Sequence, residues 1–171
     1  MAVVHKKSTA MTNATATPVV ANSANLVNGN VRASQGFAVI ASGDSTGSTF
    51  KLFRIRSSDR VESIRVYSPD IGTTTAGDLG LYDAATGVVV DADFFCSGLS
   101  LNGGALNGVD VTFEATTAGG SIANAEKRVW ESIPSGPAAD PSKEYDVVLT
   151  LTGDADAGGT ALFRMQFVSG E

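Results

Sequence analysis

Cysteine and histidine are almost missing from this chain of 171 residues, which has one of each. Cys96 has no second cysteine with which to form a disulfide, which is consistent with synthesis in a reducing compartment. His5 is the single histidine and lies far in sequence from any predicted core element. Zinc sites built from cysteine and histidine, and catalytic Cys–His pairs, are therefore excluded.

Long apolar runs and basic clusters are missing as well. No apolar run approaches the ~18 residues that a membrane-spanning helix needs. The first lysines, Lys6 and Lys7, are not followed by the apolar segment of about 7–15 residues that marks a secretory signal. No more than two basic residues are adjacent and the formal net charge is −6, so the basic patch of a nucleic-acid-binding protein is absent. We expect neither a membrane nor a nucleic acid as partner.

Glycine and small polar residues are what the chain has in abundance. Its 19 glycines exceed the usual share of about 7%, whereas charged residues make up 18% against a usual ~25%. This composition is typical of a soluble, β-rich protein with many loops. The length predicts one domain that can bury its own core, plus a short appendage.

Residues 1–35 form that appendage, an N-terminal arm without Asp or Glu. The arm has a formal charge of +3, while residues 36–171 have nine basic and eighteen acidic residues and a charge of −9. The arm is either a disordered tail or a segment that becomes ordered on a partner, and if extended it reaches ~100 Å. Its candidate contact residues are two lysines and two short apolar pairs: Lys6, Lys7, Val19, Val20, Leu26 and Val27.

Short apolar or alternating segments follow from Gly36 onward and predict strands in the domain 36–171. They are residues 36–41, 48–56, 61–67, 78–83, 88–90, 109–114, 145–152 and 161–168. The polar residues 57–60 predict a hairpin or a tight corner, and Gly80 predicts close packing or a bulge. We expect the last two strands to pair across the loop 153–160.

One helix is predicted over residues 122–133, with Ser121 as its N-cap and Pro134 as its end. An apolar stripe at helical spacing faces the core and consists of Ile122, Ala125, Val129 and Ile133, with Trp130 beside it. Seven or eight short strands and a single helix predict an all-β protein, a β-sandwich.

Two Asp-x-Asp pairs, Asp91/Asp93 and Asp154/Asp156, are the candidates for a metal site, because alternate carboxylates can converge on one calcium ion. Both pairs lack a third acidic ligand, and in glycine-rich loops such residues more often accept hydrogen bonds in turns. We therefore predict no metal and no cofactor. A hydrolase that uses Asp91 and Asp93 as paired carboxylates stays as an alternative.

Other catalytic motifs are not found, and no enzyme is expected. The chain has no G-x-S-x-G elbow, no phosphate-binding loop and no dinucleotide fingerprint. The glycine-rich residues 103–108 precede a strand instead of opening a helix, so we interpret them as a connection. Phe94, Phe95 and Cys96 are expected in the core rather than at an interface.

Six motifs follow one another within residues 36–168: FKLFRIRSSDRVESIRVYSPDI at 50–71, DLGLYDAATG at 78–87, VDADFFCSGLSL at 90–101, VTFEA at 111–115, ANAEKRVWES at 123–132 and DPSKEYDVVLT at 140–150. Their ordered succession resembles the capsid-associated proteins of tailed bacteriophages. The arm is not matched motif by motif.

This resemblance implies a capsid decoration, or cement, protein with a jelly-roll-like sandwich and an extended arm. Such a protein binds the outside of the phage head at capsomer junctions and stabilises the shell. The implied partners are the major capsid protein and further copies of the chain, as an arm-mediated homodimer or homotrimer. The alternative is a carbohydrate- or receptor-binding module of a virion, for which Trp130, Tyr67, Tyr82 and Tyr145 offer few aromatic side chains.

Overall fold

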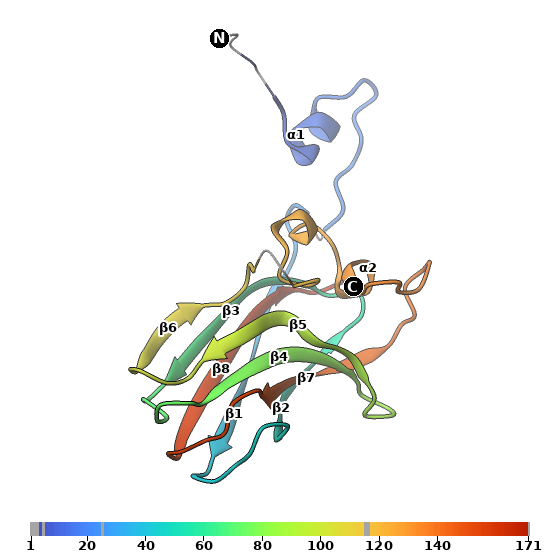
Figure 1. Ribbon diagram of the computed structural model, residues 1–171. Coiled ribbons are helices and arrows are strands. Elements are labelled where there is room, and N and C mark those ends of the chain that lie inside the picture. The colour runs from blue at the N-terminus through green and yellow to red at the C-terminus, as the bar shows by residue number, and fades with distance from the viewer. Residues whose placement is uncertain (1–3, 5, 25, 115–116, 171) are drawn as a thin grey trace.

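The computed structural model describes residues 4, 6–24, 26–114 and 117–170. Eight strands form the body (Figure 1): β1 (Val31–Ile40), β2 (Thr49–Arg56), β3 (Arg60–Ser68), β4 (Ala76–Asp83), β5 (Val89–Ser100), β6 (Leu106–Asp110), β7 (Glu144–Leu151) and β8 (Gly159–Val168). Two short α-helices, α1 (Thr9–Ala14) and α2 (Val129–Ser132), and a 3-10 helix (Ile122–Asn124) accompany them.

The strands form two antiparallel sheets of four strands each. Sheet A has the order β1-β8-β3-β6, and sheet B has the order β2-β7-β4-β5. Among consecutive strands of the chain, β4 and β5 pair within one sheet, while most other connections cross between the sheets. Eight strands in two such sheets are the arrangement of a jelly roll. The predicted all-β, jelly-roll-like sandwich is confirmed.

The connections between strands decide between the predicted alternatives. β2 and β3 lie in different sheets, so the polar residues between them form the corner, one of the two predicted possibilities, and not the hairpin. β7 and β8 also lie in different sheets, so the predicted pairing of the last two strands is wrong. β7 lies between β2 and β4, and β8 lies between β1 and β3. Alternation shows which face a side chain occupies but not which strand lies next to it.

β6 ends earlier than the predicted strand 109–114. The Oγ1 atom of Thr112 accepts the backbone N–H of Ile64 at 2.7 Å, and Oδ1 of Asp110 accepts the N–H of Thr112 at 2.9 Å. These side-chain hydrogen bonds accompany one remaining backbone bond between this segment and β3, from the N–H of Val111 to the carbonyl of Ile64 at 2.9 Å. The polar residues that alternate along 109–114 are the ones that end the strand.

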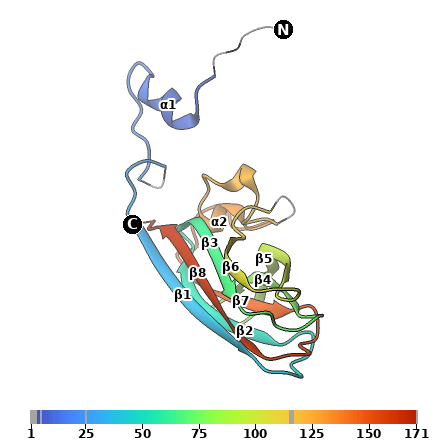
Figure 2. The ribbon, with the colours of Figure 1, turned by 90° about the vertical axis from the view of Figure 1, so that its left-hand side faces the viewer.

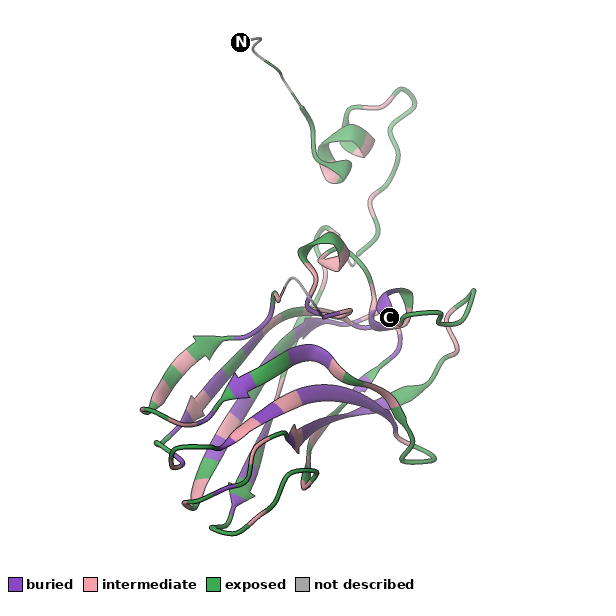
Figure 3. Cartoon of the chain, in the orientation of Figure 1, coloured by how far each residue is buried: buried purple, intermediate pink, exposed green. Residues whose placement is uncertain are grey.

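The core lies between the two sheets; buried residues alternate with exposed ones in the second half of β1 and along much of β8, whereas β4 and β7 are buried over most of their length (Figure 3). Phe94 and Phe95 are each 1% exposed, and their rings pack edge to face with centroids 4.7 Å apart. Cys96 beside them is fully buried. The prediction that these three residues are core residues is confirmed.

Gly80 on β4 faces a large irregularity of β5, as predicted. Leu79 pairs with Cys96 and Leu81 pairs with Asp91, so β5 has extra residues between these two positions. A side chain at Gly80 would clash with the backbone of Asp91 and Ala92. The bulge therefore requires a glycine at this position.

The arm stands away from the sandwich at the end where β1 begins (Figures 1 and 2). β1 starts at Val31, so the predicted boundary between residues 35 and 36 falls inside a strand. The arm as a separate segment ends before Val31. It is not fully extended, because residues 9–14 form α1, which Ser8 caps by accepting the N–H of Met11 at 3.3 Å.

The predicted continuous helix 122–133 is wrong. It is split into the 3-10 helix at residues 122–124 and α2, and Ile122 is 78% exposed. The N–H of Val129, which would bond to Ala125 in a helix, instead donates to the carbonyl of Asp59 at 2.9 Å. The carbonyl of Ala125 accepts from Nη1 of Arg60 at 3.2 Å. The helical hydrogen bond between Val129 and Ala125 is therefore absent, because each of its two groups bonds instead to Asp59 or Arg60, at the junction of β2 and β3.

Candidate functional site

The arm folds back on itself through hydrogen bonds of its own. The Asn13 side-chain amide donates to Oδ1 of Asn22 at 2.9 Å, and Val20 donates its N–H to the carbonyl of Asn13 at 3.1 Å. Lys7 donates from Nζ to Oγ1 of Thr15 at 2.8 Å. Within the described part of the chain, the hydrogen bonds of residues 7–23 all join arm residues to one another. The arm is thus a small closed loop that does not depend on the sandwich.

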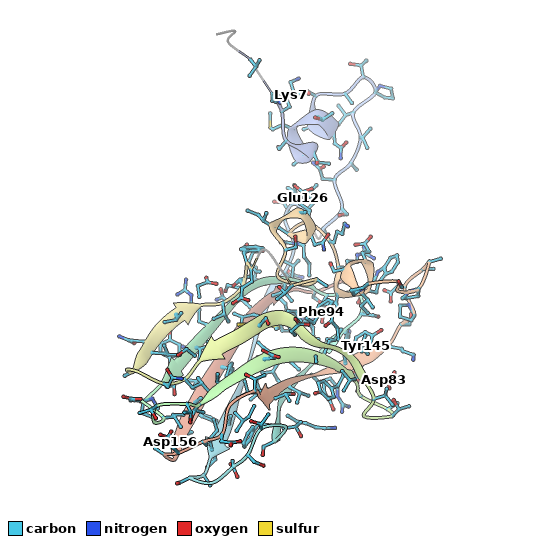
Figure 4. The ribbon with its side chains drawn as sticks, viewed as in Figure 1. Lys7, Asp83, Phe94, Glu126, Tyr145 and Asp156 are labelled. Carbon is cyan, nitrogen blue, oxygen red and sulfur yellow. The ribbon has the colours of Figure 1, made fainter. Side chains whose placement is uncertain are left out.

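The six predicted contact residues lie along this arm but do not form one patch. Val19 and Val20 are 71% and 49% exposed at the turn of the loop. Lys6 and Lys7 are exposed and precede α1 in the chain, and Figure 4 shows Lys7 far from the sandwich. Leu26 and Val27 lie nearer the body, where Leu26 is half-buried and Val27 is 36% exposed.

The base of the arm is anchored to the end of sheet A. Gly29 lies against Val168 and the carbonyl of Ala24, so closely that a side chain at residue 29 would clash with both. The carbonyl of Asn30 accepts the N–H of Ser169 at 3.0 Å. This contact fixes where the arm leaves the body and buries Val168 on the outward face of β8.

The Asp154/Asp156 pair holds loops together at the opposite end of the sandwich (Figure 4). Oδ1 of Asp154 accepts the N–H and Oγ1 of Thr46 at 2.7 and 2.9 Å. Asp156 accepts Oγ1 and the N–H of Thr73 at 2.6 and 2.8 Å. These hydrogen bonds lower the pKa of both carboxyl groups. Both carboxylates are therefore engaged by other loops rather than by their own turn.

The Asp91/Asp93 pair lies on β5, where the N–H of Asp93 donates to Oδ1 of Asp91 at 3.4 Å. Burial raises the pKa of Asp91, and the neighbouring Asp93 raises it further. Among the residues that the structure describes, no three His, Cys, Asp or Glu side chains gather as metal ligands. The bond between Asp93 and Asp91 places the two carboxylates close together on β5.

A charged cluster that the sequence did not reveal joins strands far apart in the chain. Nζ of Lys143 donates to Oδ2 of Asp83 at 3.0 Å, and Asp146 accepts from Nε of Arg54 at 2.8 Å and from Nζ of Lys51 at 3.1 Å. The hydrogen bond from Lys143 lowers the pKa of Asp83 to about 2. Burial opposes a low pKa for Asp146, but Arg54 and Lys51 lower it nevertheless. Such carboxylates stay ionised near neutral pH, so neither can act there as a general acid.

None of the four aromatic residues that the sequence offered for carbohydrate binding is exposed: two are buried and two are half-buried. Tyr145 and Tyr82 are 4% and 9% exposed. Trp130 on α2 is half-buried, and its Nε1 atom has no hydrogen-bond partner among the described residues. Tyr67 lies half-buried on the outward face of sheet A, and Tyr82 lies on the outward face of sheet B with its hydroxyl 2.8 Å from Oγ1 of Thr150.

Comparison with known proteins gives no family. No protein-family model matches the chain, and no curated protein matches it. None of the helices in the described ranges has the length and apolarity to cross a membrane. Among solved structures, a chain of the cyanophage Pam1 capsid asymmetric unit aligns with a TM-score of 0.47 and 13% sequence identity, covering 82% of this chain and 85% of that chain.

Proposed function

We propose that the protein is a structural component of a virion, a decoration protein that binds the outside of a phage head at capsomer junctions. The observation that carries the proposal is the arm, which projects from a jelly-roll body and exposes Val19 and Val20 without covering them on the same chain. An exposed apolar segment of this kind favours a role in contact with other subunits.

Charge supports the same role for the arm. The arm has no carboxylate and a positive formal charge, whereas the rest of the chain is strongly negative. A positive arm is attracted to the acidic body of a neighbouring copy, and Lys6 near its free end has no acidic residue of the arm to neutralise it. The proposed partners are therefore the major capsid protein and further copies of this chain, in a homodimer or homotrimer.

Repetition makes a modest contact effective. A shell presents the same junction many times, so one arm contact for each copy adds up over the particle. The arm can also add a strand to a sheet edge, such as β6 at the end of sheet A or β5 at the end of sheet B. The role is mechanical and not catalytic: the ion-paired Asp83 and Asp146 stabilise the body.

Deletion of residues 1–22 tests the proposal. The deletion leaves the turn at Ser23 and the anchor of Gly29 on Val168 intact, so the body should keep its thermal unfolding temperature. Full-length protein should co-sediment with purified phage heads, and the truncated protein should be lost from them on dilution.

A double substitution provides a matched comparison. Val19→Ser with Val20→Ser should weaken head binding, whereas Val88→Ser, which alters a 62% exposed valine of the body, should not. Failure of the full-length protein to bind heads would contradict the proposed function. Equal binding by full-length and truncated protein would contradict the role of the arm.

A further inference from the structure

The outward face of sheet A, which points away from sheet B, carries an apolar row that crosses three strands. Phe37 on β1 and Tyr67 on β3 are both Cα partners of Leu162 on β8, so the three side chains lie side by side. Phe37 is 58% exposed and Val39, on the same face of β1, is 68% exposed. Large apolar side chains are thus grouped on the outward face of sheet A.

The Tyr67 ring is held in place on this face by β6. A Cβ atom at Gly108 would lie 3.1 Å from the Tyr67 hydroxyl and 3.2 Å from its ring, so the ring lies across the glycine. Gly108 has a φ of 71°, which favours glycine on its own account. The aromatic side chain is therefore positioned before any partner arrives.

Two arginines lie next to the apolar row. Arg65 on β3 and Arg164 on β8 are Cα partners, and both are exposed. Neither guanidinium group forms a hydrogen bond or an ion pair with any residue that the structure describes. Asp110 is the cross-strand neighbour of Arg65 on β6, but its Oδ1 atom accepts the N–H of Thr112 and forms no ion pair with the arginine.

The two arginines line a groove of about 360 Å³ together with Tyr67, Ser63 and Gln166. Oγ of Ser63 donates to Oε1 of Gln166 at 3.2 Å, which leaves the arginines as the charged groups of the groove. Arginine forks match the two oxygens of a carboxylate, and tyrosine and arginine are enriched where protein interfaces are tightest.

We propose that this face of sheet A is a docking surface for an acidic segment of a partner protein, with Arg65 and Arg164 binding one of its carboxylates and Phe37 contacting an adjacent apolar side chain. The identification of the partner as a shell protein rests on the proposed function. The inference that this surface binds a carboxylate rests on its own residues and does not depend on that function.

The charge of the surface decides between the possible occupants. The arm of a second copy is unsuitable because it contains no carboxylate. The same face of a second copy is also unsuitable, since a symmetric contact would bring four arginines together. A nucleic acid would be repelled by a chain with a net charge of −6.

Titration of ¹⁵N-labelled full-length protein with poly-L-glutamate tests the surface without a known partner. Amide shifts should move on β1, β3 and β8 around Arg65, Arg164 and Phe37. The Arg65→Gln/Arg164→Gln variant should bind at least about tenfold more weakly, because each charge-assisted hydrogen bond is worth more than a neutral one. The matched control is Lys51→Gln/Arg54→Gln, which removes two positive charges from the outward face of sheet B and should bind poly-L-glutamate as the wild type does.

Three results would overturn the proposal: unchanged affinity of the Arg65/Arg164 variant, shifts confined to other surfaces, or tighter binding of polygalacturonate, an acidic glycan, than of poly-L-glutamate.

Binding to phage heads separates this inference from the proposed function. If the wild type binds heads and the Arg65/Arg164 variant binds equally well, the docking surface is wrong and the decoration role stands. If the wild type binds poly-L-glutamate through these arginines but does not bind heads, the surface stands and the decoration role is wrong.

Discussion

Arg65 and Arg164 are direct cross-strand partners on β3 and β8, so two side chains of like charge lie opposite each other on sheet A. Like charges in this position destabilise a sheet by an amount comparable to the ~0.2–1 kcal/mol of a favourable pair. Arg164→Gln should therefore raise the free energy of unfolding by about 0.2–1 kcal/mol at low salt. Urea denaturation at low and high NaCl measures the change, which should shrink with salt because the residues are exposed.

Lys51→Gln is expected to change the free energy of unfolding in the opposite direction. Lys51 forms an ion pair with the nearly buried carboxylate of Asp146 at 3.1 Å, so its removal should lower stability. A destabilising effect of Arg164→Gln would mean that Arg164 supports the fold, and it would count against a role reserved for a partner.

Acid should destabilise the protein as Asp83 becomes protonated. Its pKa is about 2 in the folded protein against an ordinary value of 3.8, because Lys143 and the N–H of Thr86 donate to its carboxylate. A carboxyl group with a lowered pKa stabilises the fold above its ordinary pKa, and that contribution is lost as the pH falls from about 4 to about 2. Asp83→Asn should lower the unfolding temperature at pH 7 and flatten its decline over this range.

Thermal unfolding of wild type and Asp83→Asn at several pH values between 2 and 7 provides the measurement. Asp93→Asn is a suitable comparison, since Asp93 forms no ion pair with a basic side chain in the part of the chain that the structure describes. Parallel curves for wild type and Asp83→Asn would show that Asp83 does not link folding to pH.

Gly80→Ala should destabilise the sandwich strongly. The added methyl group would meet backbone atoms of Asp91 and Ala92, which cannot move aside as a flexible side chain can. Overpacking of this kind costs about 1–3 kcal/mol, to be measured by urea denaturation. Gly98→Asn on the same β5 strand is the control, because Gly98 has a φ of 65° that asparagine tolerates and no atoms within 4 Å of its added carbon. Equal stability of Gly80→Ala and wild type would mean that the bulge can shift.

Local patterns in the sequence predict the strands but not their neighbours. Alternation locates β2 and β3 closely, and an apolar run locates β7, which is buried over most of its length. The pairing of β8 with β1 and β3 joins residues 95 or more positions apart, so it depends on the whole chain and has no local signature. The strand pattern alone predicted a β-sandwich, and the prediction of a jelly roll came from the resemblance to capsid-associated proteins.

The helix over 122–133 shows how tertiary contacts override a local pattern. Its apolar spacing is helical, but Arg60 and the carbonyl of Asp59 take the hydrogen bonds that would join Ala125 to Val129. The docking surface was missed for a related reason. Phe37, Arg65 and Arg164 come from three strands and meet only when sheet A forms.

Cys96 should be unreactive in the folded protein. Burial raises the pKa of its thiol, and the carboxylate of Glu114, which accepts from Sγ at 3.1 Å, raises it further. Since the thiolate is the reactive form, labelling by DTNB at pH 8 should be slow and should follow the opening of the sandwich. Ser97→Cys places a second thiol on the exposed neighbouring position of β5, and this thiol should react at once. Rapid reaction of Cys96 in the wild type, at the rate of the Ser97→Cys thiol, would mean that β5 opens readily at the edge of sheet B.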